Sequence, residues 1–98
     1  MRRIMHGDVM SAARALLTVP EAGRERFCAK LIERADRADR YCRQTGHVHL
    51  MWGNGSLMAA ARTYSLPPEP SLEDDIYCSC IEMVLHMLVE WRISQRRS

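Results

Sequence analysis

The segment of residues 21–45 constrains the fold most strongly, because it contains no proline and only one glycine. A stretch of this length with apolar residues at helical spacing is typical of a long amphipathic helix. At 100° per residue, five of its side chains fall within an arc of about 80°: Phe27, Leu31, Ala35, Ala38 and Cys42. Gly46 follows, and glycine often ends a helix in a left-handed conformation. The pattern predicts a helix over about 21–45 whose apolar arc faces a core.

Two shorter helices are predicted on either side of this segment. Over about 8–18, apolar residues at helical spacing follow Asp8, a residue type suited to cap the first amides. This helix is expected to end before Pro20, because the residue preceding a proline is disfavoured in helical conformation. Ser56 is expected to cap a short helix over about 56–64, whose alanines permit the close approach of a neighbouring helix.

A fourth helix is predicted over about 72–95. Ser71 followed by Asp74 is close to the capping-box pattern. Acidic residues begin the segment and arginines end it, an order that complements the helix dipole. Apolar side chains cover more than half of the helical wheel, so this helix either is central in a bundle or offers one flank to a partner. Together the four segments predict an all-α, four-helix bundle-like fold in one domain, residues 1–98.

Composition favours a small, cytoplasmic globular protein. The chain has 98 residues, of which 47% are hydrophobic and 27% are charged, and these proportions are ordinary for one globular domain. A chain of this length has a modest core, so a large apolar face favours assembly. No apolar stretch approaches the ~20 residues of a membrane span. His6, Gly7 and Asp8 stand where a signal peptide would need apolar residues.

The residues that could carry metal or covalent chemistry do not form a recognisable motif. His47 and His49 lie near each other, but Cys78 and Cys80 would point about 200° apart on a helix, unlike paired zinc ligands. The four cysteines are expected to be reduced and to lie inside helices, where thiolates are not stabilised. Residues 53–56 could offer amides to an anion, but a glycine turn before a helix is the favoured interpretation. We predict no catalytic residues, no metal site and no cofactor.

The sequence predicts an interaction surface more readily than an active site. The predicted protein–protein interface comprises Met83, Met87 and Trp91 of the last helix together with Trp52. The expected function is that of a non-enzymatic interaction or adaptor protein, with a second copy of the chain or another protein as its partner.

Two alternatives stay open. One is a nucleic-acid-associated regulator that uses a basic flank of the second helix: Arg26, Lys30, Arg34 and Arg37. Acidic residues four positions before several arginines, and a net charge of only +2, indicate instead a self-neutralised helix surface. The other alternative is a metal-binding or thiol protein, which requires the histidines of residues 47–49 to converge on a cysteine.

Several segments carry a resemblance to a known family. These are residues 2–9 (RRIMHGDV), residues 39–41 with 45–46, and above all residues 52–61 (WGNGSLMAAA). They resemble a group of short bacterial proteins known as a domain of unknown function. The resemblance spans most of the chain and implies a bacterial cytoplasmic protein. It implies no activity, cofactor or catalytic residue.

Overall fold

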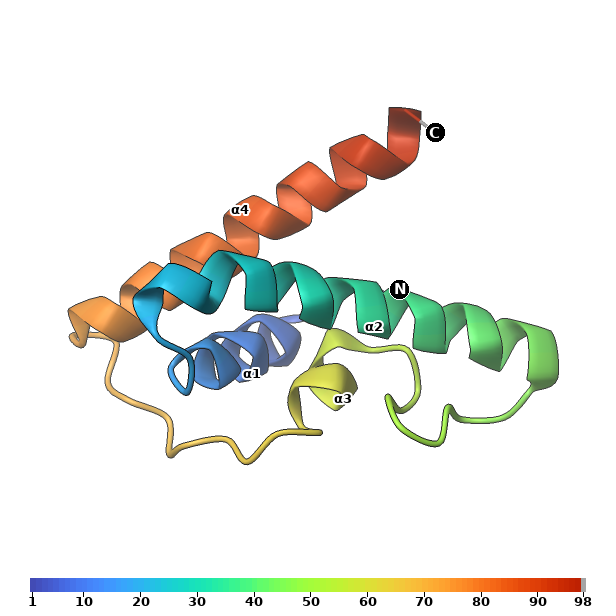
Figure 1. Ribbon diagram of the computed structural model, residues 1–98, viewed down its shortest axis with the longest axis horizontal. Helices are drawn as coiled ribbons and strands as arrows, with labels where there is room; N and C mark the ends of the chain where they lie inside the picture. The colour runs from blue at the N-terminus through green and yellow to red at the C-terminus, as the bar shows by residue number, and fades with distance from the viewer. Residues whose placement is uncertain (98) are drawn as a thin grey trace.

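The helices follow the proline and glycine pattern of the sequence in the computed structural model, which describes residues 1–97 (Figure 1). The element order is α1 (His6–Leu16), the 3-10 helix η1 (Glu21–Gly23), α2 (Arg24–Thr45), α3 (Leu57–Ala61) and α4 (Asp75–Arg97). The predicted all-α fold, with four helices packed together in one domain, is confirmed. An isolated antiparallel β-bridge joins His49 to Gly53 in the connection between α2 and α3.

The long predicted helix is confirmed, with a tight 3-10 turn at its start. η1 leads directly into α2, and Gly46 ends α2 with a φ of 76° while its N–H donates to the carbonyl of Cys42 at 2.8 Å. A φ in this left-handed region is accessible to glycine without strain. Leu31, Ala35 and Ala38 are buried, so the predicted apolar arc does face the core.

The first helix begins earlier than predicted, which changes the role of Asp8. α1 starts at His6, and Asp8 occupies its third position. The Asp8 carboxylate reaches back to accept the N–H of Met5 at 2.8 Å, as the third residue of a capping box does. α1 also ends two residues early, because the Arg24 guanidinium donates from Nε to the carbonyls of Leu16 and Val19.

α3 is shorter at both ends than predicted, whereas α4 both begins and ends later than predicted. Ser56 caps α3 as expected, accepting the N–H of Ala59 at 3.1 Å. The predicted start of the last helix near Ser71 is wrong. Asp74 caps α4 by accepting the N–H of Tyr77 at 3.0 Å, while Ser71 caps a separate turn before it. A carboxylate next to the positive end of the helix dipole explains why Asp74 sets the boundary.

Alanine-rich surfaces bring the helices close together. α1 and α2 each pack against the other three helices, whereas α4 packs against α1 and α2. The buried alanines are Ala12, Ala13 and Ala15 of α1, Ala35 and Ala38 of α2, and Ala60 and Ala61 of α3. Tyr77 of α4 is fully buried among them, and its hydroxyl donates to Glu69 at 3.0 Å. Burial and this carboxylate raise the pKa of Tyr77 to about 12.

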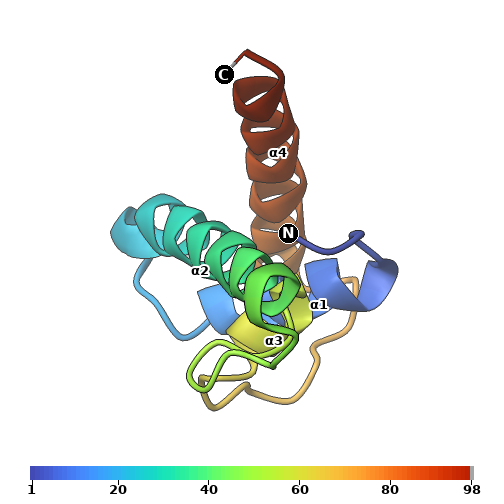
Figure 2. The ribbon, with the colours of Figure 1, turned by 90° about the vertical axis from the view of Figure 1, so that its right-hand side faces the viewer.

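α4 leaves the bundle at its C-terminal half. Its buried residues are Tyr77, Cys80, Val84 and Leu88, and no residue from Val89 to Arg97 is buried. Figures 1 and 2 show this half extending away from the other helices in two perpendicular views. None of the helices formed by residues 1–97 has the length and hydropathy needed to cross a bilayer.

Candidate functional site

The segment that carries the family resemblance is tied into the fold by a buried carboxylate. Asp8 is 5% exposed, and while one of its oxygens accepts the N–H of Met5, the other accepts the N–H of Met58 at 2.8 Å. The carboxylate therefore joins the N-termini of α1 and α3, which lie 50 residues apart in the chain. Both amides stand at helix N-termini, where no acceptor within the helix is available to them. Both hydrogen bonds of the Asp8 carboxylate therefore serve the structure of the fold.

The two glycines of the same segment are needed for backbone conformation and for close approach. Gly53 and Gly55 have φ values of 84° and 96°, in the region that favours glycine. A Cβ on Gly55 would lie 2.6 Å from the Cα of Asp39 in α2, and a Cβ on Gly53 would lie 2.7 Å from the Cβ of Ala59. No substituent fits either position. The glycines thus allow the loop to lie against α2 and α3.

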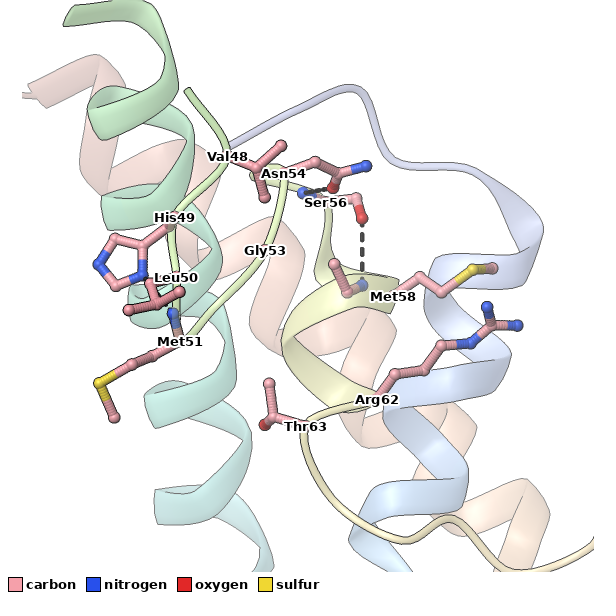
Figure 3. A pocket seen from close by; sticks show the side chains of 11 residues that line it. Val48, His49, Leu50, Met51, Gly53, Asn54, Ser56, Met58, Arg62 and Thr63 are labelled. Carbon is pink, nitrogen blue, oxygen red and sulfur yellow. Dashed lines mark hydrogen bonds between the residues drawn. The ribbon is translucent and has the colours of Figure 1, made fainter. Parts of the chain in front are cut away.

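The amides near this turn are already used within the chain. Asn54 accepts the N–H of Ser56 at 3.0 Å, and Ser56 accepts that of Ala59 (Figure 3). Asp8 accepts the N–H of Met58. An anion would have to displace these bonds, and α3 is only five residues long. The arrangement supports the turn interpretation of residues 53–56 over an anion site.

His49 organises the loop that precedes the glycines. Its Nδ1 accepts the N–H groups of both Met51 and Trp52 at 3.1 Å. Its ring stacks on that of Trp52, with centroids 4.7 Å apart and planes 2° from parallel. The backbone of His49 also exchanges two hydrogen bonds with Gly53. Trp52 is half-buried, and it holds the loop together with His49.

Replacing His49 by Phe is expected to loosen this loop without unfolding the protein. Phenylalanine keeps a ring that can stack but removes the acceptor for two N–H groups, a loss of about 1–2 kcal/mol in local stability. Hydrogen exchange at the Met51 and Trp52 amides should become about tenfold faster. His47→Phe is the matched control, because the His47 side chain is exposed on the same loop. Equal exchange in both variants would contradict this role of His49.

A row of rings and one guanidinium attaches the loop to α2. Phe27, Arg34 and Tyr41 lie seven residues apart on one flank of α2. The Arg34 guanidinium lies 5.8 Å from the Trp52 ring and 6.0 Å from the Tyr64 ring, and it donates to the Tyr64 hydroxyl. Tyr64 also meets Phe27 edge-on at 5.1 Å, and Tyr41 meets His49 at 5.0 Å. The spacing of 27, 34 and 41 is the signal in the sequence for this row.

These contacts bear on the predicted basic flank of the second helix. Arg34 is half-buried and engaged with Trp52 and Tyr64, and Arg37 pairs with Glu33 at 2.7 Å. Arg26 and Lys30 are exposed. The predicted acid-first pairs along α2 are present, with Arg40 to Asp36 at 3.2 Å and Arg43 to Asp39 at 2.6 Å. Of the four predicted flank residues, Arg34 and Arg37 are therefore engaged within the chain.

Three apolar side chains of the loop point away from the core. Val48, Leu50 and Met51 are exposed, and Leu50 is 98% exposed. Beside them lies an open hollow of about 460 Å³ between the loop and α3, with Arg62 and Met58 along its other side (Figure 3). The hydrogen bonds that His49 makes within the loop fix the loop backbone, and so keep these three apolar side chains exposed to water.

The predicted interface residues of α4 lie on the side of the helix that meets the bundle. Met83, Met87 and Trp91 are half-buried and pack against the core. Met83 and Met87 also line an open hollow of about 390 Å³ with Glu25, Glu82 and His86. The exposed apolar side chains of the middle of α4 are instead Leu85, at 50% exposure, and Val89, at 45%. Trp52 lies in the loop between α2 and α3, where its ring stacks on His49 and faces the Arg34 guanidinium.

The cysteines and histidines of residues 1–97 are not part of any cluster that could hold a metal ion. Cys28 and Cys80 are buried thiols, and burial raises the pKa of Cys28 to about 12 and also raises that of Cys80. Thiols with raised pKa values are poor nucleophiles and poor metal ligands at neutral pH. Within residues 1–97, no three His, Cys, Asp or Glu side chains gather closely enough to hold a metal ion.

The comparisons with known proteins identify a family and nothing more specific. No curated protein and no solved structure matches the chain. The sequence model described as Domain of unknown function (DUF7742) matches residues 2–88, which include Asp8 and the whole glycine turn. Since this match covers most of the 98 residues, the chain belongs to the DUF7742 family.

Proposed function

We propose that this protein is a non-enzymatic helical interaction protein that associates with itself through α4. The observations that carry the proposal are that the C-terminal half of α4 leaves the bundle (Figure 2) and that Leu85 and Val89, near the middle of this helix, are exposed. An extended helix with unburied apolar residues is more stable when a second surface covers it. The cytoplasmic location expected from the sequence is retained with this proposal.

The residues of the family segment support a non-enzymatic function, because their contacts are structural. Asp8, Gly53, Gly55 and Ser56 each have a contact that explains them within the monomer. They form no group in which a nucleophile, a base and an anion site meet, as an enzyme of common design would need. Met83, Met87 and Trp91 pack one side of α4 onto the core, and so leave the opposite side available to a partner.

A charged residue at position 85 should break the assembly while the monomer stays folded. Leu85→Glu buries two carboxylates in a symmetric dimer, one from each copy, so the dissociation constant should rise at least about a hundredfold. Leu72→Glu is the matched control, because Leu72 is 67% exposed but lies before α4. Sedimentation velocity should give a dimer for the wild type and the control, and a monomer for Leu85→Glu. A dimer that is indifferent to Leu85→Glu would contradict the proposal.

The nucleic-acid and metal alternatives stay predictions without a supporting contact. Salt-sensitive binding of duplex DNA or RNA that is lost on reversing Arg26 and Lys30 would favour the first. These two residues are the better targets, because Arg34 and Arg37 already have contacts within the chain.

A further inference from the structure

The outer side of α4 carries a row of residues that is nearly symmetric about Val89. This row, the α4 seam, consists of Glu82, Leu85, Val89, Ile93 and Arg96. Spacings of three and four residues keep these side chains on one side of a helix. Leu85 lies four residues before Val89 and Ile93 four after it. Glu82 lies seven before and Arg96 seven after, so the seam ends in opposite charges.

The charges at the two ends of the seam have no ion-pair partner within residues 1–97. Both Glu82 and Arg96 are exposed, and neither takes part in any of the ion pairs of that part of the chain. They lie 14 residues apart, or about 21 Å along a helix, so they cannot pair with each other. Opposite charges at matched distances from one point can meet only if a second copy runs the other way.

We propose that α4 pairs with α4 of a second copy in antiparallel orientation, about a two-fold axis at Val89. This inference rests on the proposed function and adds its geometry. A two-fold axis makes residues equidistant from it face each other. Leu85 then packs on Ile93 of the partner subunit, Val89 on the partner's Val89, and Glu82 pairs with the partner's Arg96. The two helix dipoles also oppose each other, which is favourable.

A parallel pairing of the same surfaces lacks this complementarity. It would set Glu82 beside Glu82 of the partner subunit and Arg96 beside the partner's Arg96, and like charges at facing positions are unfavourable. It would also bring the two bundles together at the same end of the helix pair. In the antiparallel arrangement each projecting end runs along the outer side of the partner's α4, and the two bundles lie at opposite ends of the helix pair. The family match ends at Leu88, so the inference concerns this chain and not the family.

A cysteine at the axis tests the geometry directly. Val89→Cys places two thiols at the two-fold axis, where Cα atoms of facing residues come close enough for a disulfide, and mild oxidation should give a covalent dimer. Leu85→Cys is the matched control, because its thiol would lie opposite Ile93 of the partner subunit, about 12 Å along the helix from its own counterpart. The wild type, oxidised in parallel, reports any dimer formed through the native cysteines.

Charge reversal gives an independent readout. Glu82→Arg and Arg96→Glu should each raise the dissociation constant about tenfold, because each introduces two like-charge contacts per dimer. The double variant restores opposite charges and should return to within about threefold of the wild type. A dimer that crosslinks through Leu85→Cys as readily as through Val89→Cys, or whose charge reversals add instead of compensating, would overturn the antiparallel geometry and leave self-association standing. A wild-type chain that stays monomeric would overturn both.

Discussion

Gly55→Ala is expected to destabilise the protein by about 3–5 kcal/mol, whereas Gly46→Ala should cost only about 1 kcal/mol. Both glycines have positive φ, 96° and 76° respectively, so both substitutions strain the backbone. Only Gly55 is also in close contact, since an added Cβ would lie 2.6 Å from the Cα of Asp39. That neighbour is backbone and cannot rotate away. Nothing lies within 4 Å of the corresponding position at Gly46.

Urea unfolding followed by far-ultraviolet circular dichroism would measure both variants. A chain of this length typically has about 5–15 kcal/mol of stability, so Gly55→Ala should shift the midpoint strongly and Gly46→Ala only slightly. Similar costs for the two would mean that φ strain alone matters and that the loop does not press on α2. Such a result would contradict the role of Gly55 in allowing the loop to lie against α2.

Asp8→Ala is the second substitution with a large expected effect, a loss of about 3 kcal/mol. It leaves the amides of Met5 and Met58 without their acceptor, and each lost bond to a buried carboxylate costs about 1.5–3 kcal/mol before any rescue by water. Asp74→Ala is the matched control. Asp74 is an exposed cap that accepts the amide of Tyr77, so its loss should cost about 1 kcal/mol.

Asp8→Asn separates the two bonds of this carboxylate. The amide side chain has one oxygen to accept with and places an N–H₂ group against the other N–H, so its cost should lie between those of wild type and Asp8→Ala. Equilibrium unfolding reports the total, and hydrogen exchange at the Met58 amide reports the contact between α1 and α3. If Asp8→Ala cost no more than Asp74→Ala, the proposed link between the two helix N-termini would be wrong.

The helices could be predicted because their signals are local. Gly46 ends α2, Ser56 caps α3 and Pro20 follows the end of α1, and each of these acts within a few residues of itself. The boundary errors at Asp8 and Ser71 have one cause. Where two acceptors compete near a helix start, the favoured one depends on surrounding contacts, and for Asp8 these include the amide of Met58 on another helix.

The candidate surfaces could be predicted only in part from the sequence. An apolar excess on the last helix was evident, but which flank the bundle covers depends on how α4 crosses α1 and α2. Met87 and Leu85 are both apolar in the sequence, yet the first packs on the core and the second is half exposed. In the sequence Arg34 likewise looks like an unpaired cation, and only folding brings Trp52 and Tyr64 to it.

Self-association of this chain through the outer side of α4 is the central claim. Light scattering of the wild-type protein over a dilution series tests it most directly. We expect twice the mass of one chain at high concentration and a reversible fall toward one chain on dilution. A mass of one chain at every concentration would contradict the claim, and would assign Leu85 and Val89 to the free surface of a monomer.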